Sequence, residues 1–343
     1  MGEGELLSYE QAWFSGVKPD AQWWSEPEAP MKRGGRKAKL ETAIGSVRLS
    51  NPVMTASGTV GHSTELARYL DYSELGAVVV KSLAPYEWPG NPPPRVHPAP
   101  AGMINSVGLQ GPGLPRWLAE ELPVLAASGA RAVVSIWGRS LDDYAAASDL
   151  LASADHRAME AVVAVEVNVS CPNLEDRGRM FSHSAAMTQA ALAVTSTCGL
   201  PRWAKLSATG DLVDIAGAAV EGGAEALTLV NTLLGMVIDT ESRQPVLGGG
   251  GGGVSGRAIG PVAVRSVFDV RAAMPEVPII GVGGIASGAD AVEMMMAGAS
   301  AVQVGTAAFA DPRAPAKVLR ELARWCASHG VSRLDELIGA AHE

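Results

Sequence analysis

Residues 168–173 read Asn-Val-Ser-Cys-Pro-Asn and bring two carboxamides and one thiol together within six positions. They follow an apolar run, Ala161 to Val167, with the composition of a buried strand. A carboxamide offers hydrogen-bond donors and an acceptor, and a thiol exchanges its proton near neutral pH once its thiolate is favoured. The segment therefore predicts a site for a planar ligand rich in carbonyl and N–H groups, with Cys171 as a base. A plain turn is an equal alternative for the segment alone, since Asn, Ser and Pro favour turns and Cys is often a small buried hydrophobe.

The rest of the chain from about residue 45 alternates apolar, β-branched segments with segments of helical spacing. The predicted strands are Pro52–Ala56, Ala77–Lys81, Arg131–Ile136, Ala161–Asn168, Arg202–Leu206, Ala226–Asn231, Pro278–Val282 and Ala301–Val304. The predicted helices are Thr64–Leu75, Leu141–Leu151, Ala185–Thr197, Leu212–Gly222, Val262–Met274, Ala289–Ala297 and Pro315–His329. This alternation favours an α/β fold with parallel strands, and eight strands over about 300 residues match a (β/α)8 TIM barrel. A doubly wound sheet is the alternative.

A TIM barrel requires its reactive residues at the C-terminal ends of the strands, where the βα loops build the site. The expected strand ends carry a polar set: Ser57, Gly58, Lys81, Ser82, Ser135, Asn168 to Asn173, Lys205, Ser207, Asn231 and Thr232. We therefore expect these residues on one rim of the barrel.

Glycines at the ends of the last two strands predict an anion site. Gly281-Val-Gly-Gly-Ile285 ends the seventh strand and Gly305-Thr306 ends the eighth, where barrels often bind a phosphate. Glycine lets backbone N–H groups approach an anion, and the N-terminus of a following helix adds positive charge.

Lys81 and Lys205 each end an otherwise apolar strand, where a buried ammonium needs an anionic partner. The charge that develops on a flavin ring as it accepts a hydride is one candidate partner. The other interpretation is a lysine whose head reaches solvent at the rim. Two lysines, a thiol and a phosphate site fit FMN, and they also fit a sugar phosphate.

Composition restricts the class of protein. The 343 residues carry a formal net charge of −9, which argues against a general nucleic-acid binder. The three cysteines, Cys171, Cys198 and Cys326, show no Cys-x-x-Cys spacing, so we expect no disulfide framework, metal site or iron–sulfur cluster in this chain. The N-terminus lacks the pattern of a signal peptide and no apolar run nears the ~20 residues of a membrane span. We expect a cytoplasmic protein without a membrane partner.

The first 44 residues differ from the remainder. They contain Trp13, Trp23, Trp24 and a basic run at 32–39, and we interpret residues 1–44 as an extension with a flexible linker. Residues 45–343 are expected to form the catalytic barrel.

From about residue 45 to the C-terminus, the chain resembles class 1 dihydroorotate dehydrogenases, which are FMN-containing barrel enzymes of pyrimidine synthesis. The matching motifs are Ala56-Ser-Gly58, Lys81-Ser82, Gly90-Asn-Pro-Pro-Pro-Arg95, Asn105-Ser-Val-Gly-Leu-Gln110, residues 168–173, Lys205-Leu-Ser207, Asn231-Thr-Leu-Leu-Gly235, Gly252-Gly-Val-Ser-Gly256, Gly281–Ile285 and Gly305-Thr306.

The resemblance implies roles for the matching residues in the oxidation of dihydroorotate to orotate. Cys171 would be the base that removes the C5 proton while FMN N5 accepts the C6 hydride, with Lys81 as a second catalytic residue. The implied substrate residues are Lys81, Asn105, Ser106, Val107, Gly108, Leu109, Asn168, Asn173, Asn231 and Thr232. The implied FMN residues are Ser57, Lys81, Ser82, Ser135, Asn168, Lys205, Val230, Gly256, Gly283, Gly284, Gly305 and Thr306.

The resemblance is greatest to the NAD-linked subtype at 105–112, 231–247 and 252–264. Those enzymes pass electrons to a subunit that carries FAD and an iron–sulfur cluster. We therefore expect a homodimer that can associate with such an electron-transfer subunit. Departures from the subtype are Ser135, Ala208-Thr209, Trp137 in place of a smaller residue, and six consecutive glycines at 248–253, which we expect to be flexible. The fumarate-linked subtype, an oxidoreductase of another dihydropyrimidine, and a non-catalytic FMN-binding paralogue remain alternatives.

Overall fold

The protein is described here by a computed structural model that covers residues 38–170 and 180–342. An eight-stranded parallel sheet forms its centre, in the order β3-β16-β15-β10-β9-β8-β7-β4. A parallel bridge between Met54 and Ala77 joins the first and last strands, so the sheet closes into a barrel. The strands are β3 (Val53–Thr55), β4 (Val78–Val79), β7 (Ala132–Ile136), β8 (Val162–Asn168), β9 (Arg202–Leu206), β10 (Ala226–Leu229), β15 (Ile279–Val282) and β16 (Ala301–Val304). The prediction of a TIM barrel is confirmed, and each strand lies within an expected segment.

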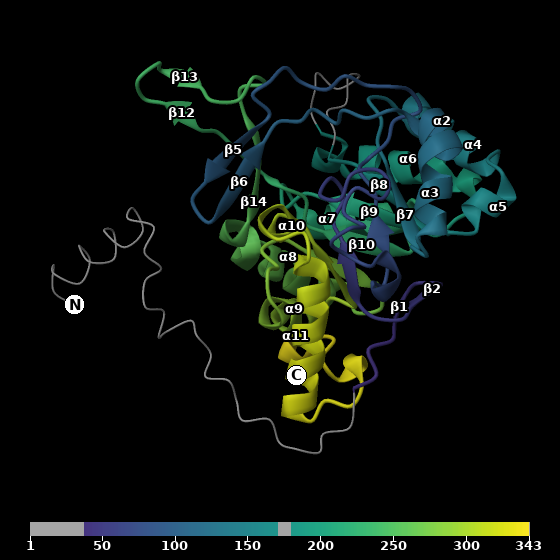
Figure 1. Ribbon diagram of the computed structural model, residues 1–343, viewed down its shortest axis with the longest axis vertical. Coiled ribbons are helices and arrows are strands. Elements are labelled where there is room, and N and C mark those ends of the chain that lie inside the picture. The colour runs from purple at the N-terminus through teal and green to yellow at the C-terminus, as the bar shows by residue number, and fades with distance from the viewer. Residues whose placement is uncertain (1–37, 171–179, 343) are drawn as a thin grey trace.

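Helices surround the barrel, with α2 to α6 gathered on one side and α8, α9 and α11 on another (Figure 1). Six helices agree with the predicted segments: α4 (Leu141–Ala152), α6 (Ala185–Val194), α7 (Leu212–Glu221), α8 (Gly260–Ala273), α9 (Gly288–Met296) and α11 (Ala314–His329). Short helices α5 (His156–Met159) and α10 (Ala307–Ala310) were not anticipated.

The predicted helix at Thr64–Leu75 is wrong. The segment forms turns and a single 3₁₀ turn, η1 (Tyr72–Glu74), whose start is capped by the Asp71 side chain. Its apolar residues Leu70, Tyr72 and Leu75 are buried all the same. Helical spacing of apolar residues therefore reflects contact with the barrel here, without a regular helix.

A helical stretch over residues 114–127 was missed because its prolines indicate loops. It consists of α2 (Leu114–Arg116), a π-helical turn η2 (Trp117–Glu121) and α3 (Leu122–Ala127). Pro123, which has no N–H, is the second residue of α3, just beyond the π turn, which changes the hydrogen-bond register where a proline would otherwise break the helix.

A hairpin closes the bottom of the barrel. It is formed by β1 (Thr42–Ile44) and β2 (Val47–Leu49), which pair antiparallel. Ile44, Val47 and Leu49 are buried in one apolar cluster with residues from the early parts of the barrel strands, among them Met54 and Trp203. The hairpin spans the expected boundary between residues 44 and 45. Residues 1–37 lie outside the described part of the chain.

A second, antiparallel sheet stands over the C-terminal rim of the barrel (Figure 1). Its order is β11-β14-β6-β5, and its strands are β5 (Val96–Ala99), β6 (Gly102–Asn105), β11 (Leu233–Gly235) and β14 (Gly252–Gly256). Beyond it projects a two-stranded hairpin of β12 (Ile238–Asp239) and β13 (Gln244–Pro245). The β6–β14 pair sets Asn105 opposite Gly253, so two distant insertions form one wall.

The six glycines at 248–253 lead into this wall, and the flexibility expected of the run stays a prediction. Gly252 and Gly253 lie in β14. A Cβ at Gly249 would meet the Ser106 hydroxyl, at Gly252 the Asn105 carbonyl and at Gly253 the Thr232 hydroxyl, all closer than atoms can approach. The run is therefore needed for close packing against residues of the expected substrate site.

Cys198 and Cys326 are buried in the main hydrophobic core. Burial raises the pKa of the Cys326 thiol, which keeps it in the unreactive protonated form. Across residues 38–170 and 180–342, no helix combines the length and apolarity needed to cross a bilayer.

Candidate active site

A cavity of about 1440 Å³ opens at the C-terminal ends of the barrel strands, beneath the second sheet. Residues that the sequence analysis assigns to a site line this cavity, some from the barrel and some from the second sheet. They are Ser57, Lys81, Ser82, Asn105, Ser106, Val107, Gly108, Leu109, Asn168, Lys205, Val230, Asn231, Thr232, Gly256, Gly283, Gly284, Gly305 and Thr306. Cys171 and Asn173 lie outside the described residues, and Ser170, directly before them in the chain, lines the cavity.

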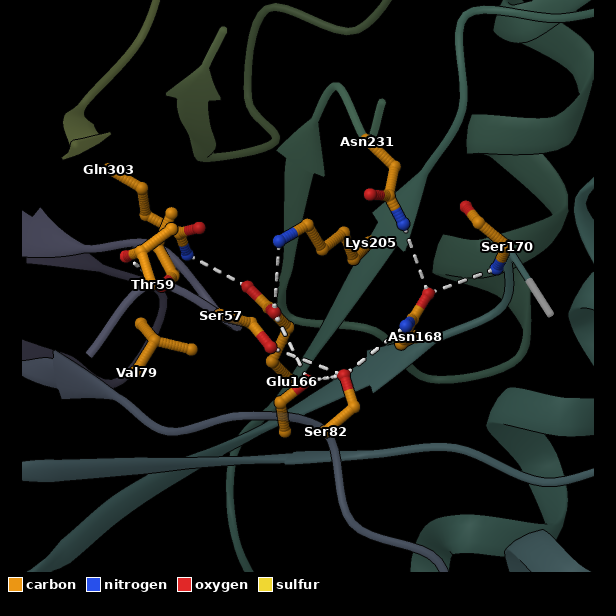
Figure 2. A network of polar contacts seen from close by, with 12 residues as sticks. Ser57, Thr59, Val79, Ser82, Glu166, Asn168, Ser170, Lys205, Asn231 and Gln303 are labelled. Atoms are coloured by element: carbon orange, nitrogen blue, oxygen red, sulfur yellow. Dashed lines mark hydrogen bonds and ion pairs between the residues drawn. The ribbon is translucent and has the colours of Figure 1, made fainter. Parts of the chain in front are cut away.

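Two carboxamides are joined to each other on the cavity floor. Asn231 Nδ2 donates to Asn168 Oδ1 at 3.2 Å, and the Ser170 backbone N–H donates to the same oxygen. Asn168 Nδ2 donates to Ser82 Oγ at 3.2 Å, and the Tyr144 hydroxyl donates to the Asn168 carbonyl. Figure 2 shows Asn168 between Ser82 and Asn231. The end of β8 is therefore held in one orientation, with both amides facing the cavity.

Ser135 differs from the other predicted residues, because it lies below the cavity lining. It is fully buried, and its hydroxyl lies 2.9 Å from that of Ser82. Ser82 in turn lies 3.2 Å from Ser57 Oγ. Ser135 therefore connects to the cavity indirectly, through the hydroxyl of Ser82.

Glu166 and Gln303 lie beneath the same floor, and sequence reasoning missed both. Glu166 is fully buried on β8, and its Oε1 lies 3.4 Å from Lys205 Nζ. Gln303 on β16 donates from Nε2 to Glu166 Oε2 at 2.8 Å (Figure 2). The signal was available, because an acidic residue in an apolar strand needs a buried partner.

The expected anion site is a cradle of glycines. Gly256, Gly283 and Gly284 have φ values of 101°, 128° and 80°, which side chains rarely adopt. A Cβ on Gly284 would lie 2.5 Å from Gly260 Cα. The Thr306 hydroxyl lies beside them and bonds Ser255 Oγ at 2.8 Å. Backbone and hydroxyl donors can therefore approach a ligand closely here.

The helix expected to support this cradle is already capped. Asp290 Oδ2 accepts from the backbone N–H groups of Ala286 and Ser287 at the start of α9. Asp290 also pairs with Arg257 at 3.3 Å. The N-terminus of α9 is therefore satisfied by its own carboxylate, while α10 (Ala307–Ala310) begins directly after Thr306, and the expected contribution of a following helix to an anion site stays a prediction.

The loop Asn105–Leu109 is held by residues 88–91. Trp88 Nε1 donates to the Gly108 carbonyl at 2.9 Å, and the Asn91 backbone N–H donates to the Val107 carbonyl at 3.0 Å. Asn91 Nδ2 donates to Ser106 Oγ at 2.8 Å. Leu109 has a φ of 61°, an unfavourable conformation for leucine, which these bonds help to hold.

Trp88 is itself fixed by aromatic and cationic neighbours. Its ring packs edge-to-face with Trp137 at 6.1 Å, and the Arg139 guanidinium lies 4.6 Å from its centre. Trp137, which departs from the expected smaller residue, is buried. Its size therefore serves as support for Trp88 and, through it, for the loop.

His62 lies close behind Lys81. Burial first, and then the positive charge of Lys81, lower the pKa of His62 to about 4. Its Nε2 has no hydrogen-bond partner among the residues described. The imidazole is therefore neutral at physiological pH and adds no charge beside the lysine.

Comparison with known proteins gives a consistent family. The family model described as dihydroorotate dehydrogenase matches residues 39–325. The dihydroorotate dehydrogenase B (NAD+) catalytic subunit of Desulforudis audaxviator is 46% identical over 308 residues, which cover 89% of this chain and 98% of the relative. The subunit of the same name from Pelobacter propionicus is 43% identical over 306 residues, covering 89% of this chain and 99% of the relative.

A third such subunit, from Geobacter sp. strain M21, is 41% identical over 307 residues, with 89% and 99% of the two chains covered. These matches extend over the barrel, the covering sheet and the cavity residues alike. The resemblance found in the sequence motifs is thus confirmed, and the chain belongs to the dihydroorotate dehydrogenase family.

Proposed function

We propose that this protein oxidises dihydroorotate to orotate in pyrimidine synthesis, with FMN bound in the cavity, as the catalytic subunit of an NAD-linked enzyme. The observation that carries the proposal is the convergence of Asn105, Asn168 and Asn231 on a cavity that also contains Lys81 and Lys205. Three amides match the alternating carbonyl and N–H groups of a pyrimidine ring. Two ammonium groups match a carboxylate and a ring that gains negative charge.

The shape of the cavity supports FMN. Bound FMN would supply the hydride acceptor of the reaction. Gly256, Gly283 and Gly284 line the cavity with positive φ angles and close backbone packing that a side chain would disturb, so with Gly305 and Thr306 they would hold the phosphate through backbone and hydroxyl donors. Lys205, Ser57, Ser82 and Val230 would hold the ring system, and Ser135 would act from behind Ser82.

The substrate would lie against the covering sheet. Asn105 and Thr232 stand on the two insertions and Asn168 and Asn231 at barrel strand ends, so the four would surround the pyrimidine ring. The backbone of Ser106 to Leu109, fixed by Trp88 and Asn91, would receive the substrate carboxylate with Lys81 beside it. Asn173 is proposed as a further ring contact on sequence grounds.

Cys171 is proposed as the base that takes the C5 proton. The assignment rests on its position in the 168–173 motif, since the residue lies outside the described part of the chain. His62 has a pKa of about 4 and is therefore neutral at physiological pH, so its imidazole adds no positive charge next to Lys81.

A separate electron-transfer subunit is proposed as partner. The relatives are named as catalytic subunits of NAD+ enzymes, which implies a second chain. The three cysteines of this sequence are too few to bind an iron–sulfur cluster, which usually takes four thiolates. A homodimer of the catalytic subunit would then associate with a subunit that carries FAD and the cluster.

The test is anaerobic stopped-flow of the purified protein with dihydroorotate, following the flavin absorbance. Rapid bleaching that is reversed only by an electron-transfer subunit with NAD+ supports the proposal in full. Reversal by fumarate alone would refute the NAD-linked subtype. A protein that binds FMN but is not bleached would indicate another dihydropyrimidine substrate or a non-catalytic role.

A further inference from the structure

Three hydrogen-bond donors converge on the buried carboxylate of Glu166. Its Oε1 receives Lys205 Nζ at 3.4 Å and Ser135 Oγ at 3.3 Å, and its Oε2 receives Gln303 Nε2 at 2.8 Å. The residue is fully buried, as are Ser135 and Gln303. Donors on both oxygens, one of them an ammonium, match the ionised carboxylate, which accepts hydrogen bonds and donates none.

An acceptor at the end of a chain of hydroxyls determines the direction of every bond in it. Ser135 has one hydroxyl hydrogen, and it points to Glu166. The 2.9 Å contact between Ser82 and Ser135 must therefore be donated by Ser82. Ser57, at 3.2 Å from Ser82, must likewise donate its own hydrogen. The hydroxyls of Ser57, Ser82 and Ser135 thus donate one to the next in the direction of Glu166.

The direction continues into the two amides of the cavity. Since the hydrogen of Ser82 is used, its oxygen accepts from Asn168 Nδ2. Asn168 must then present Oδ1 to the other side, where Asn231 Nδ2 and the Ser170 N–H donate to it. Asn231 Oδ1 accepts from the Thr232 N–H at 2.9 Å. One hydrogen of Asn231 Nδ2 is left to donate to a ligand oxygen.

We propose that Glu166 is a positioning residue that acts through Ser135 and Ser82, together with the backbone N–H groups of Ser170 and Thr232, to set the donor and acceptor orientation of Asn168 and Asn231, and that also holds Lys205 towards the cavity. The inference rests on the proposed function, because the ligands of these groups are the pyrimidine ring and FMN. Glu166 acts along two separate routes, a chain of hydroxyls to the amides and an ion pair to the lysine.

The two routes have different expected readouts. Replacement of Ser135 by Ala cuts the hydroxyl chain and leaves the ion pair, so it should raise the KM for dihydroorotate about tenfold and leave the flavin midpoint potential unchanged. Replacement of Glu166 by Gln affects both routes. It should raise KM similarly and raise the potential by about 30 mV, which is a tenfold change for a two-electron couple, because the charge of Lys205 is no longer offset.

The matched control is Ser148→Ala. Ser148 is a fully buried serine in α4, whose hydroxyl donates to the Thr195 carbonyl at 2.9 Å and lies 2.7 Å from the Thr197 hydroxyl, apart from the bonds of the floor network. The Ser148→Ala variant loses a hydroxyl group that is as fully buried as the one lost in Ser135→Ala, and it should keep the wild-type KM and flavin potential. Melting temperatures of both alanine variants measure the structural effect of losing a buried hydroxyl.

The experiment uses the FMN-loaded protein. A KM in Ser135→Ala equal to that in Ser148→Ala overturns the directional role, whether or not Glu166→Gln folds. An unchanged potential in folded, FMN-loaded Glu166→Gln overturns the role towards Lys205. A wild-type protein that binds no FMN, or is not bleached by dihydroorotate, contradicts the proposed function itself, and this result is read before any variant is compared.

Discussion

The ammonium of Lys205 lies 3.4 Å from the carboxylate of Glu166, and both side chains are buried beneath the rim of the barrel. The ion pair of Arg265 with Asp269, in contrast, lies in α8 at the surface. A buried pair has a different energetic character, because either charge alone would be stranded away from water.

Replacing Lys205 by Met should therefore destabilise the protein by about 3–5 kcal/mol, since Glu166 is left without its cation. Adding Glu166→Gln to that variant should recover part of the loss. Urea unfolding of the single and double variants measures both effects. A double variant no more stable than the single one would contradict the pairing, and Arg265→Met should change stability little because that pair is exposed.

The thiol of Cys171 should set the rate of flavin reduction by substrate. Replacing it with Ser should slow reduction by about 10²–10⁴-fold, because a hydroxyl is a far weaker acid and a poor base at neutral pH. In the wild type, the rate should rise with pH towards the thiol pKa of about 8.5. Stopped-flow measures both, with Cys198→Ala, a change in the core, as control. Equal rates in Cys171→Ser and wild type would exclude this base.

The indole N–H of Trp88 should affect substrate affinity through the loop at 105–109. Trp88→Phe keeps an aromatic ring for Trp137 and Arg139 but removes the donor to the Gly108 carbonyl. Loss of one such bond, worth about 1 kcal/mol, should raise KM for dihydroorotate roughly fivefold. Trp325→Phe is the control, because that ring stacks on His329 in α11. The prediction fails if both variants have the same KM.

The glycine run can be tested one residue at a time. A Cβ at Gly253 would collide with the Thr232 hydroxyl, whereas at Gly251 the nearest atom is the Gly235 carbonyl oxygen at 3.3 Å. Gly253→Ala should therefore cost about 1–3 kcal/mol of stability by overpacking and raise KM, while Gly251→Ala changes both less. Thermal melts and steady-state kinetics measure both changes. Equal effects of Gly253→Ala and Gly251→Ala would contradict the prediction.

The depressed pKa of His62 predicts a pH dependence of stability. The folded pKa is about 4 and the unfolded one about 6.5, so between these values the unfolded chain binds a proton that the folded protein does not. Stability should thus fall as pH falls from about 6.5 to 4. In His62→Gln this contribution should disappear, and the melting temperature should decline less steeply over that range. Parallel slopes for the two proteins would contradict the prediction.

Strand positions and the family could be predicted from the sequence because most strands fall in short, largely apolar runs with polar residues at or after their ends, as at Ala77–Lys81. The oxidation of dihydroorotate, expected from the motifs, is confirmed at the level of the family. The individual roles of the site residues stay predictions. Their placement around one cavity follows from a single rule, that parallel barrels collect their strand ends at one rim.

The covering sheet could not be predicted, because its strands lack alternating apolar residues. Pro98 in β5 argues against a strand and is tolerated because β5 lies at the sheet edge. β14 is mostly glycine, and only its close approach to Asn105 and Thr232 explains it. The position of Glu166 in an apolar strand indicated a buried partner, but the identity of that partner could not be predicted, because Gln303 is 137 residues away in the sequence.

The pairing of β6 with β14 also bears on how the chain emerges from the ribosome. Asn105 and its partner Gly253 are 148 residues apart in the sequence. The strand β4 precedes both insertions, and between them lie β7, β8, β9 and β10. β6 is therefore synthesised long before β14, and such distant pairs form slowly. Most of the barrel can assemble while the wall over the cavity is still half made, so the ability to bind a ligand is acquired late in synthesis.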